Sequence, residues 1–116
     1  MNIEDLQAIC KKLPAVTEDI KWEDHLCFNV GGKMFLVTAP DNVPVTASFK
    51  ASDEDFADLS EKEGFSPAPY MARYKWIFIN DIRLMNKKQW QHYIQQSYNL
   101  IKDKLPNKTK KELGIQ

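Results

Sequence analysis

The sequence predicts an α+β fold in which an antiparallel sheet carries the N- and C-terminal helices on one face. Segments with helical periodicity stand near both ends, at residues 2–13 and after residue 86. Between them lie alternating apolar runs joined by turn residues, as in antiparallel strands. The order of these segments has no repeating strand–helix–strand unit, which a parallel sheet would require.

The first helix is predicted over residues 2–13. Asn2 can act as its N-cap because its side chain can accept a bond from a free N–H group of the first turn. Pro14 lacks a backbone N–H and stops the helix. One face is apolar and contains Ile3, Leu6, Ile9, Cys10 and Leu13.

Strands are predicted over residues 19–38, where alternating apolar runs stand on both sides of Gly31 and Gly32. Two adjacent glycines tolerate the positive φ angles of a tight hairpin turn, so this pair indicates a hairpin. A turn at residues 40–42 then leads to a third strand over residues 45–49, where apolar residues again alternate.

A short helix follows, capped by Ser52 and ended by Gly64 in a left-handed conformation. Residues 65–74 contain two prolines and are predicted to be a loop. Residues 76–79 are apolar and short, which indicates a further strand, and a turn follows it.

The longest helix is predicted to begin after Asn86, with Gln89 completing a capping box, and to end at Pro106. Residues 1–105 therefore form one domain, and residues 106–116 form a polar, basic C-terminal tail. The apolar face of the long helix contains Trp90, Ile94, Ser97, Ile101 and Leu105.

Composition narrows the classes of function. Lys plus Arg and Asp plus Glu both number 16, so the net charge is zero, which counts against a dedicated nucleic-acid binder but allows a local basic patch. Cys10 and Cys27 stand alone, so the sequence predicts neither a disulfide framework nor a zinc site. The chain shows no signal-peptide pattern and no apolar run of about 20 residues. We expect a cytoplasmic protein without membrane contact, metal or cofactor.

Candidate catalytic residues are few. His25 and Cys27 share a strand face, so a pair is conceivable, but nothing supplies a third, orienting group, and strand packing is the favoured interpretation. His92 falls on the polar face of the last helix and is expected to be solvated. Ser97 is small enough for close packing, and its hydroxyl can bond the carbonyl four residues back. We therefore expect no catalytic residue and no enzymatic activity.

Basic and aromatic residues alternate over residues 70–76. This mixture suits nucleic acid, because rings stack on bases while cations neutralise phosphates. A second basic group, between Lys102 and Lys111, is interpreted as a solvated tail. The candidate DNA-binding residues are Lys33, Lys50, Tyr70, Arg73, Tyr74, Lys75 and Arg83.

Acidic residues gather around Trp22, at Glu18, Asp19, Glu23 and Asp24. Clustered carboxylates can hold hard cations, but this segment lacks the alternating spacing and central glycine of a calcium-binding loop. A solvated loop is the favoured interpretation.

An ordered set of short motifs spans nearly the whole chain. It consists of Leu13-Pro14, Trp22, Gly32-Lys33-Met34-Phe35, Pro67-Ala68-Pro69-Tyr70, Lys75-Trp76, Ser97-Tyr98 and Leu105-Pro106. Together these motifs resemble the MmcQ/YjbR family. The resemblance implies a fold similar to that of CyaY, the bacterial frataxin, and a function described as DNA binding. One departure is Glu23, because many members of the family have glycine just after the first tryptophan.

Two functions therefore remain open, with an enzyme ranked last. The first is a DNA-binding protein that contacts mainly phosphates of double-stranded DNA from loops and sheet edges. The alternative is a protein-interaction or frataxin-like module that binds a partner or metal through the acidic segment 18–24. A contiguous basic face would favour the first, and an acidic ridge the second. Open sheet edges are compatible with a monomer or a weak dimer.

Overall fold

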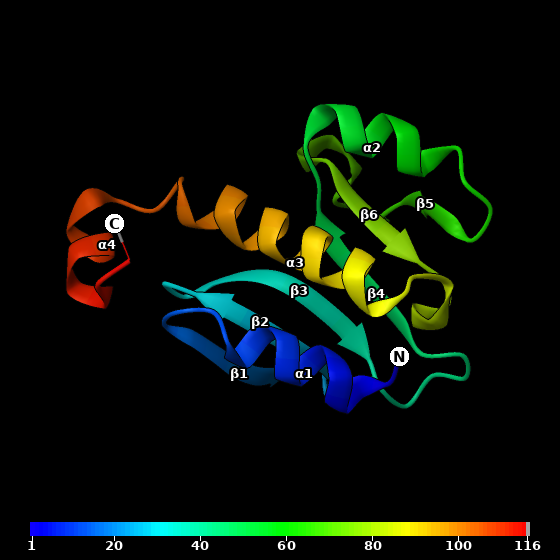
Figure 1. Cartoon of the computed structure of the whole chain (residues 1–116), viewed down its shortest axis with the longest axis horizontal. Coiled ribbons are helices and arrows are strands. Elements are labelled where there is room, and N and C mark those ends of the chain that lie inside the picture. The colour runs from blue at the N-terminus through cyan, green and yellow to red at the C-terminus, as the bar shows by residue number, and fades with distance from the viewer. Residues whose placement is uncertain (116) are drawn as a thin grey trace.

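The structure is a computed structural model that describes residues 1–115 (Figure 1). Within this range the helices are α1 (Ile3–Lys11), α2 (Asp53–Ser60), α3 (Lys87–Lys102) and α4 (Asn107–Leu113), with short 3₁₀ helices η1 (Ala72–Tyr74) and η2 (Ile82–Leu84). The strands are β1 (Val16–Lys21), β2 (His25–Val30), β3 (Lys33–Ala39), β4 (Thr46–Lys50), β5 (Phe65–Pro67) and β6 (Trp76–Ile79).

The strands form one sheet in the order β1-β2-β3-β4-β6-β5, and every neighbouring pair is antiparallel. Helices α1 and α3 contact each other and lie on the same face of the sheet, and α2 packs against β5 and β6 (Figure 1). The predicted α+β class is therefore confirmed, with an antiparallel sheet and the N- and C-terminal helices on one face.

The main core lies between these helices and the sheet. Phe28, Leu36 and Phe49 point from adjacent strands toward α1 and α3 and are fully buried. Trp90 of α3 meets Phe49 edge to face, with ring centroids 5.7 Å apart. Its indole N–H donates to the carbonyl of Ile82 at 2.8 Å, which satisfies the polar end of a buried tryptophan.

Helix starts agree with the predictions. Asn2 begins α1 and Asn86 begins α3, each with a complete capping box. The reciprocal bonds satisfy N–H groups that have no partner inside the helix. Ser52 caps α2 with one such bond, its hydroxyl accepting from the N–H of Asp55 at 3.1 Å.

The hairpin between β2 and β3 is also confirmed. Gly31 and Gly32 have φ angles of 59° and 79°, which glycine adopts without the strain that a side chain adds. A Cβ atom at Gly31 would lie 2.7 Å from Cδ1 of Leu105. The segment that follows α3 therefore packs directly on this turn.

Two predictions in the middle of the chain were wrong. Helix α2 ends at Ser60, and Gly64, with φ of 88°, turns the chain into β5 instead of ending the helix. Residues 65–74 are not a continuous loop, because they include β5 and η1. Pro67 is tolerated in β5 because this strand lies at the sheet edge. Its outer side has no neighbouring strand to which a backbone N–H would have to donate.

Two further differences concern the ends of elements. Glu18 and Asp19 belong to strand β1, so the acidic segment is not a loop throughout. Helix α3 ends at Lys102, and residues 107–113 of the predicted tail form α4. Ile115 follows α4 and is buried in the main core cluster. Within residues 1–115, none of the helices combines the length and apolar content needed to cross a membrane.

Candidate functional site

A cavity of about 550 Å³ lies beside the C-terminal end of α3. Its walls come from the start of β3, the end of β4, η1, the start of β6 and the residues that follow α3. It is lined by Lys33, Met34, Lys50, Met71, Tyr74, Trp76, Ile101, Lys104, Leu105 and Pro106. Among residues 1–115, no acidic side chain lines this cavity.

The pairing of β3 with β4 stops next to this cavity. Phe28 pairs with Leu36 and Asn29 pairs with Met34, so Phe35 is an extra residue that makes a β-bulge in β3. A bulge bends its strand and increases the local twist. Leu36 faces Phe49 in β4, so the next pair in this register would join Phe35 to Lys50.

Ser97 of α3 takes the place of that pair's backbone bond. Its hydroxyl donates to the carbonyl oxygen of Phe35 at 2.5 Å and accepts from the N–H of Lys50 at 3.0 Å. The expected bond to the carbonyl four residues back in the helix is thus replaced by contacts to the sheet. These two bonds join α3 to both strands where their pairing stops.

Lysines from separate elements meet at this cavity: Lys33 begins β3, Lys50 ends β4 and Lys104 follows α3. Lys50 is 8% exposed, and its ammonium donates to the carbonyl oxygen of Tyr74. Burial lowers the pKa of Lys50, and the charge of Lys104 lowers it further. The charge of Asp53 raises this pKa, and the charge of Lys75 lowers it. The site is therefore a concentration of positive charge in a neutral chain.

An exposed basic and aromatic segment borders the cavity. The guanidinium of Arg73 lies over the ring of Tyr74, 4.8 Å from its centroid, and donates to the Tyr74 hydroxyl at 2.6 Å. Tyr74 is half exposed, and Tyr70 is fully exposed. We name this set the basic–aromatic surface, and it comprises Lys33, Lys50, Tyr70, Arg73, Tyr74, Lys75 and Lys104.

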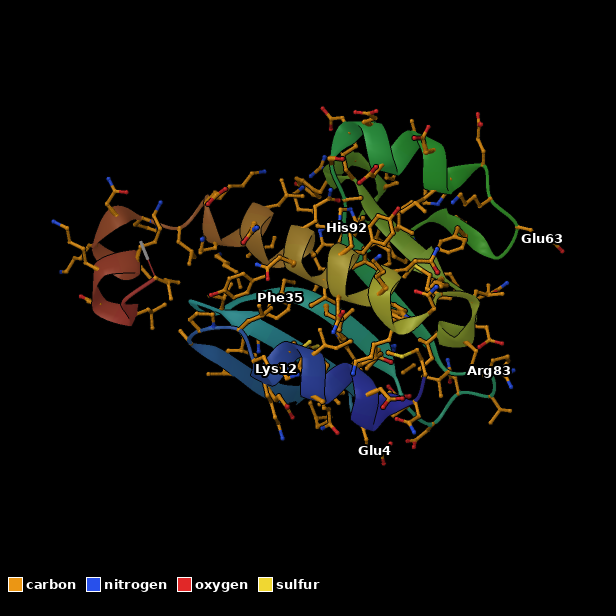
Figure 2. All side chains as sticks on the ribbon, in the orientation of Figure 1. Glu4, Lys12, Phe35, Glu63, Arg83 and His92 are labelled. Atoms are coloured by element: carbon orange, nitrogen blue, oxygen red, sulfur yellow. The ribbon has the colours of Figure 1, made fainter. Side chains whose placement is uncertain are left out.

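Arg83 lies apart from these residues. It is in η2, beyond the C-terminal end of β6, whereas Lys75 precedes the N-terminal end of that strand. Figure 2 shows Arg83 on the side of the molecule opposite to α4. Its guanidinium pairs with Asp81 at 2.8 Å, and hydrogen bonds from Arg83 hold the pKa of Asp81 below its usual value. Arg83 is therefore not part of the basic–aromatic surface.

Sequence reasoning missed two parts of this site. Lys104 was assigned to a solvated tail, although it lines the cavity with Lys33 and Lys50. The apolar lining from Met34 and Met71 was also missed. The lining residues are far apart in the sequence, so the sequence does not predict the cavity. The one signal for a close contact at this place was the small residue Ser97 in an apolar helix face.

Two acids of segment 18–24 form hydrogen bonds with different partners. Glu18 accepts a bond from the side chain of Gln7 at 3.3 Å, and Asp19 accepts one from Asn29 at 2.9 Å. Within the described residues 1–115, no group of three or more His, Cys, Asp or Glu side chains is placed to hold a metal ion.

The histidine and cysteine singled out in β2 have different partners. Nδ1 of His25 lies 2.7 Å from a carboxylate oxygen of Asp24. Cys27 is fully buried and packs in a small cluster with Val37 and Trp76. Burial raises the pKa of the Cys27 thiol, which keeps it in the unreactive protonated form. The geometry thus favours packing as the role of Cys27.

Comparison with known proteins identifies the family to which the chain belongs. The family model of YjbR matches residues 11–100. A crystal structure of a Deinococcus radiodurans protein with the domain DUF419 is similar, with a TM-score of 0.88 and 23% identity, covering 99% of this chain and 89% of that one. A Pseudomonas syringae protein has a TM-score of 0.68 and 20% identity, covering 87% of this chain and 99% of its own. No curated protein matches the sequence. At these identities the two structures show a common fold, and the match over residues 11–100 shows that the chain belongs to the YjbR family, as the sequence motifs indicated.

Proposed function

We propose that this protein binds DNA through the basic–aromatic surface and catalyses no reaction. The observation that carries the proposal is the meeting of Lys33, Lys50 and Lys104 from distant parts of a chain with no net charge. Arg73 and Lys75 extend this positive charge along the segment beside the cavity. Such a concentration attracts a polyanion although the whole protein is neutral.

The proposed contacts are mainly to phosphates. Arg73 and Lys75 are solvent-accessible cations and would replace counterions on the DNA backbone. Tyr70 carries a fully exposed ring that is available to stack on bases, whereas the half-exposed ring of Tyr74 is already covered in part by Arg73. Contacts of this kind position a protein on DNA with little reading of the base sequence. The proposal includes a cytoplasmic location.

A protein-interaction role is the second candidate, and it is favoured by the edge strand β1. This strand has a neighbour on one side, and Ile20 and Trp22 within the acidic segment are 59% and 64% exposed. An exposed strand edge can add a strand from a partner. Because Glu18 and Asp19 already bond within the chain, the acids themselves give this alternative less support.

The test is a fluorescence-anisotropy titration of labelled duplex DNA at low and near-physiological salt. A protein that neutralises several phosphates should bind with micromolar affinity at low salt and lose affinity steeply as salt rises. Lys33, Arg73 and Lys75 are then the first substitutions to make. Absence of binding at low salt would remove DNA as the ligand and direct attention to β1.

A further inference from the structure

We infer that the cavity beside the end of α3 binds a small amphipathic anion, an apolar body carrying one carboxylate or phosphate. This inference goes beyond DNA binding, because the ligand would enter the cavity instead of lying across the surface. It rests on the shape, lining and charge of the cavity, and it can be tested without DNA.

The lining divides into an apolar part and a basic part. Met34, Trp76 and Leu105 belong to the apolar part, together with side chains from η1 and α3. The basic part consists of Lys33, Lys50 and Lys104. A volume of about 550 Å³ is within the range of small-molecule sites, and most such sites combine an apolar lining with a few fixed polar groups.

Lys50 has unused hydrogen-bonding capacity in this cavity. An ammonium has three N–H donors, and the carbonyl of Tyr74 accepts one bond from it. Its side chain is largely removed from water, with Lys104 close enough for the two positive charges to repel. An anionic group between them would accept further bonds and compensate both charges.

The walls of the cavity are held by the fold. Ser97 bonds both β3 and β4 where their pairing stops. Leu105 packs on the hairpin turn at Gly31 and closes the side next to α3. The site is therefore preformed, which reduces the entropy lost when a ligand binds.

Other ligand classes fit less well. A cation would meet lysines and, among residues 1–115, no acidic lining residue. A free inorganic anion would leave Met34, Met71 and Trp76 in contact with water. A neutral apolar molecule would displace water from Lys50 without replacing its hydrogen bonds, which is unfavourable. An anion with an apolar body satisfies both parts of the lining.

The experiment is an NMR titration of the ¹⁵N-labelled full chain with octanoate and octyl phosphate. Acetate supplies the charge alone and octanol supplies the apolar body alone. We expect at least one of the two amphipathic anions to bind about tenfold more tightly than either control. The anion that binds more tightly identifies the headgroup.

The indole N–H signal of Trp76 should shift, whereas that of the core residue Trp90 should not. Octanol binding as tightly as both anions, or no binding of either anion at millimolar concentration, would overturn the inference.

Charge-removing variants test the position of the anion. Lys50→Met keeps an unbranched side chain one atom shorter, without the charge, and should weaken binding about tenfold. Lys104→Gln should weaken binding by a smaller factor. Arg83→Gln is the matched control outside the cavity and should bind as the wild type does. Folding of each variant is checked by circular dichroism, so that Lys104→Gln decides the question if Lys50→Met does not fold. Unchanged affinity in a folded lysine variant would show that the anion does not bind there.

Discussion

The hydroxyl oxygen of Ser97 accepts a hydrogen bond from the backbone N–H of Lys50 at 3.0 Å. The same hydroxyl donates to the carbonyl of Phe35, the residue that would face Lys50 if β3 and β4 continued to pair. One side chain of α3 thus replaces a backbone bond of the sheet. This contact lies beside the cavity that Lys33, Lys50 and Lys104 line.

Replacing Ser97 by alanine should destabilise the protein by about 1–3 kcal/mol, because it leaves the N–H of Lys50 and the carbonyl of Phe35 buried without a partner. Urea unfolding measures this change. Ser60→Ala is the control, since Ser60 bonds only the carbonyl of Phe56 within its own helix among the described residues, and its loss should change stability by less than about 0.5 kcal/mol. Equal effects of the two substitutions would show that the Ser97 contacts are not structural.

Alanine at Gly31 should destabilise the protein more than alanine at Gly32. Both glycines have positive φ, so both substitutions add backbone strain of about 1 kcal/mol. At Gly31 the new Cβ would also lie 2.7 Å from Leu105, whereas at Gly32 no atom lies within 4 Å. We expect an additional destabilisation of about 1 kcal/mol at Gly31 by thermal or urea unfolding.

The additional destabilisation at Gly31 should disappear when Leu105 is alanine, because the clash is with that side chain. A double-mutant cycle isolates this coupling. If Gly31→Ala destabilises both backgrounds equally, Leu105 does not pack on the turn as described.

Lys50 should make stability depend on pH in the alkaline range. Burial lowers its pKa in the folded protein, whereas the unfolded chain keeps the ordinary value of 10.5. Between these two values the unfolded chain holds a proton that the folded protein has released, so stability rises with pH. Below the pKa that Lys50 has in the folded protein, the lysine is charged in both states, and the full cost of burying its charge lowers stability.

The measurement compares wild type with Lys50→Met by urea unfolding at increasing pH. The difference in stability should shift in favour of the wild type as pH approaches 10.5, by no more than about 1.4 kcal/mol per pH unit. Titrating groups that do not interact with Lys50 cancel in this difference. A difference that stays constant over this range would mean that the ammonium of Lys50 is not buried.

Both cysteines should resist thiol reagents in the native protein. Cys10 and Cys27 are fully buried, and burial raises the pKa of each thiol. The reactive thiolate is therefore scarce as well as inaccessible. Labelling at pH 8 should be slow in buffer, and both thiols should react rapidly in denaturant. Rapid native labelling at either position would show that its packing opens readily.

The elements with strong local signals could be predicted from the sequence. Capping boxes at Asn2 and Asn86 and the hairpin at Gly31 follow from short-range hydrogen bonding and backbone freedom. Strand β5 could not be predicted in this way. It consists of the residues Phe65–Pro67 and owes its conformation to pairing with β6, a contact with no local signal.

The candidate site was predictable in part. Lys33, Lys50 and Tyr74 were singled out from charge and aromatic content, and the structure brings them to one cavity. Lys104 and Arg83 could not be placed from the sequence. Lys104 follows α3 and Arg83 follows β6, so their distance from the cavity depends on where these two elements end in the tertiary structure.

The most direct test of the proposed function compares two arginine variants in binding to duplex DNA. The slope of log K against log salt concentration reports the number of phosphates neutralised. We predict that Arg73→Gln makes this slope shallower by about 0.9, the value for one lost phosphate contact, and that Arg83→Gln leaves it unchanged. If the wild type fails to bind at low salt, or if both variants change the slope equally, the basic–aromatic surface is not a DNA-binding site.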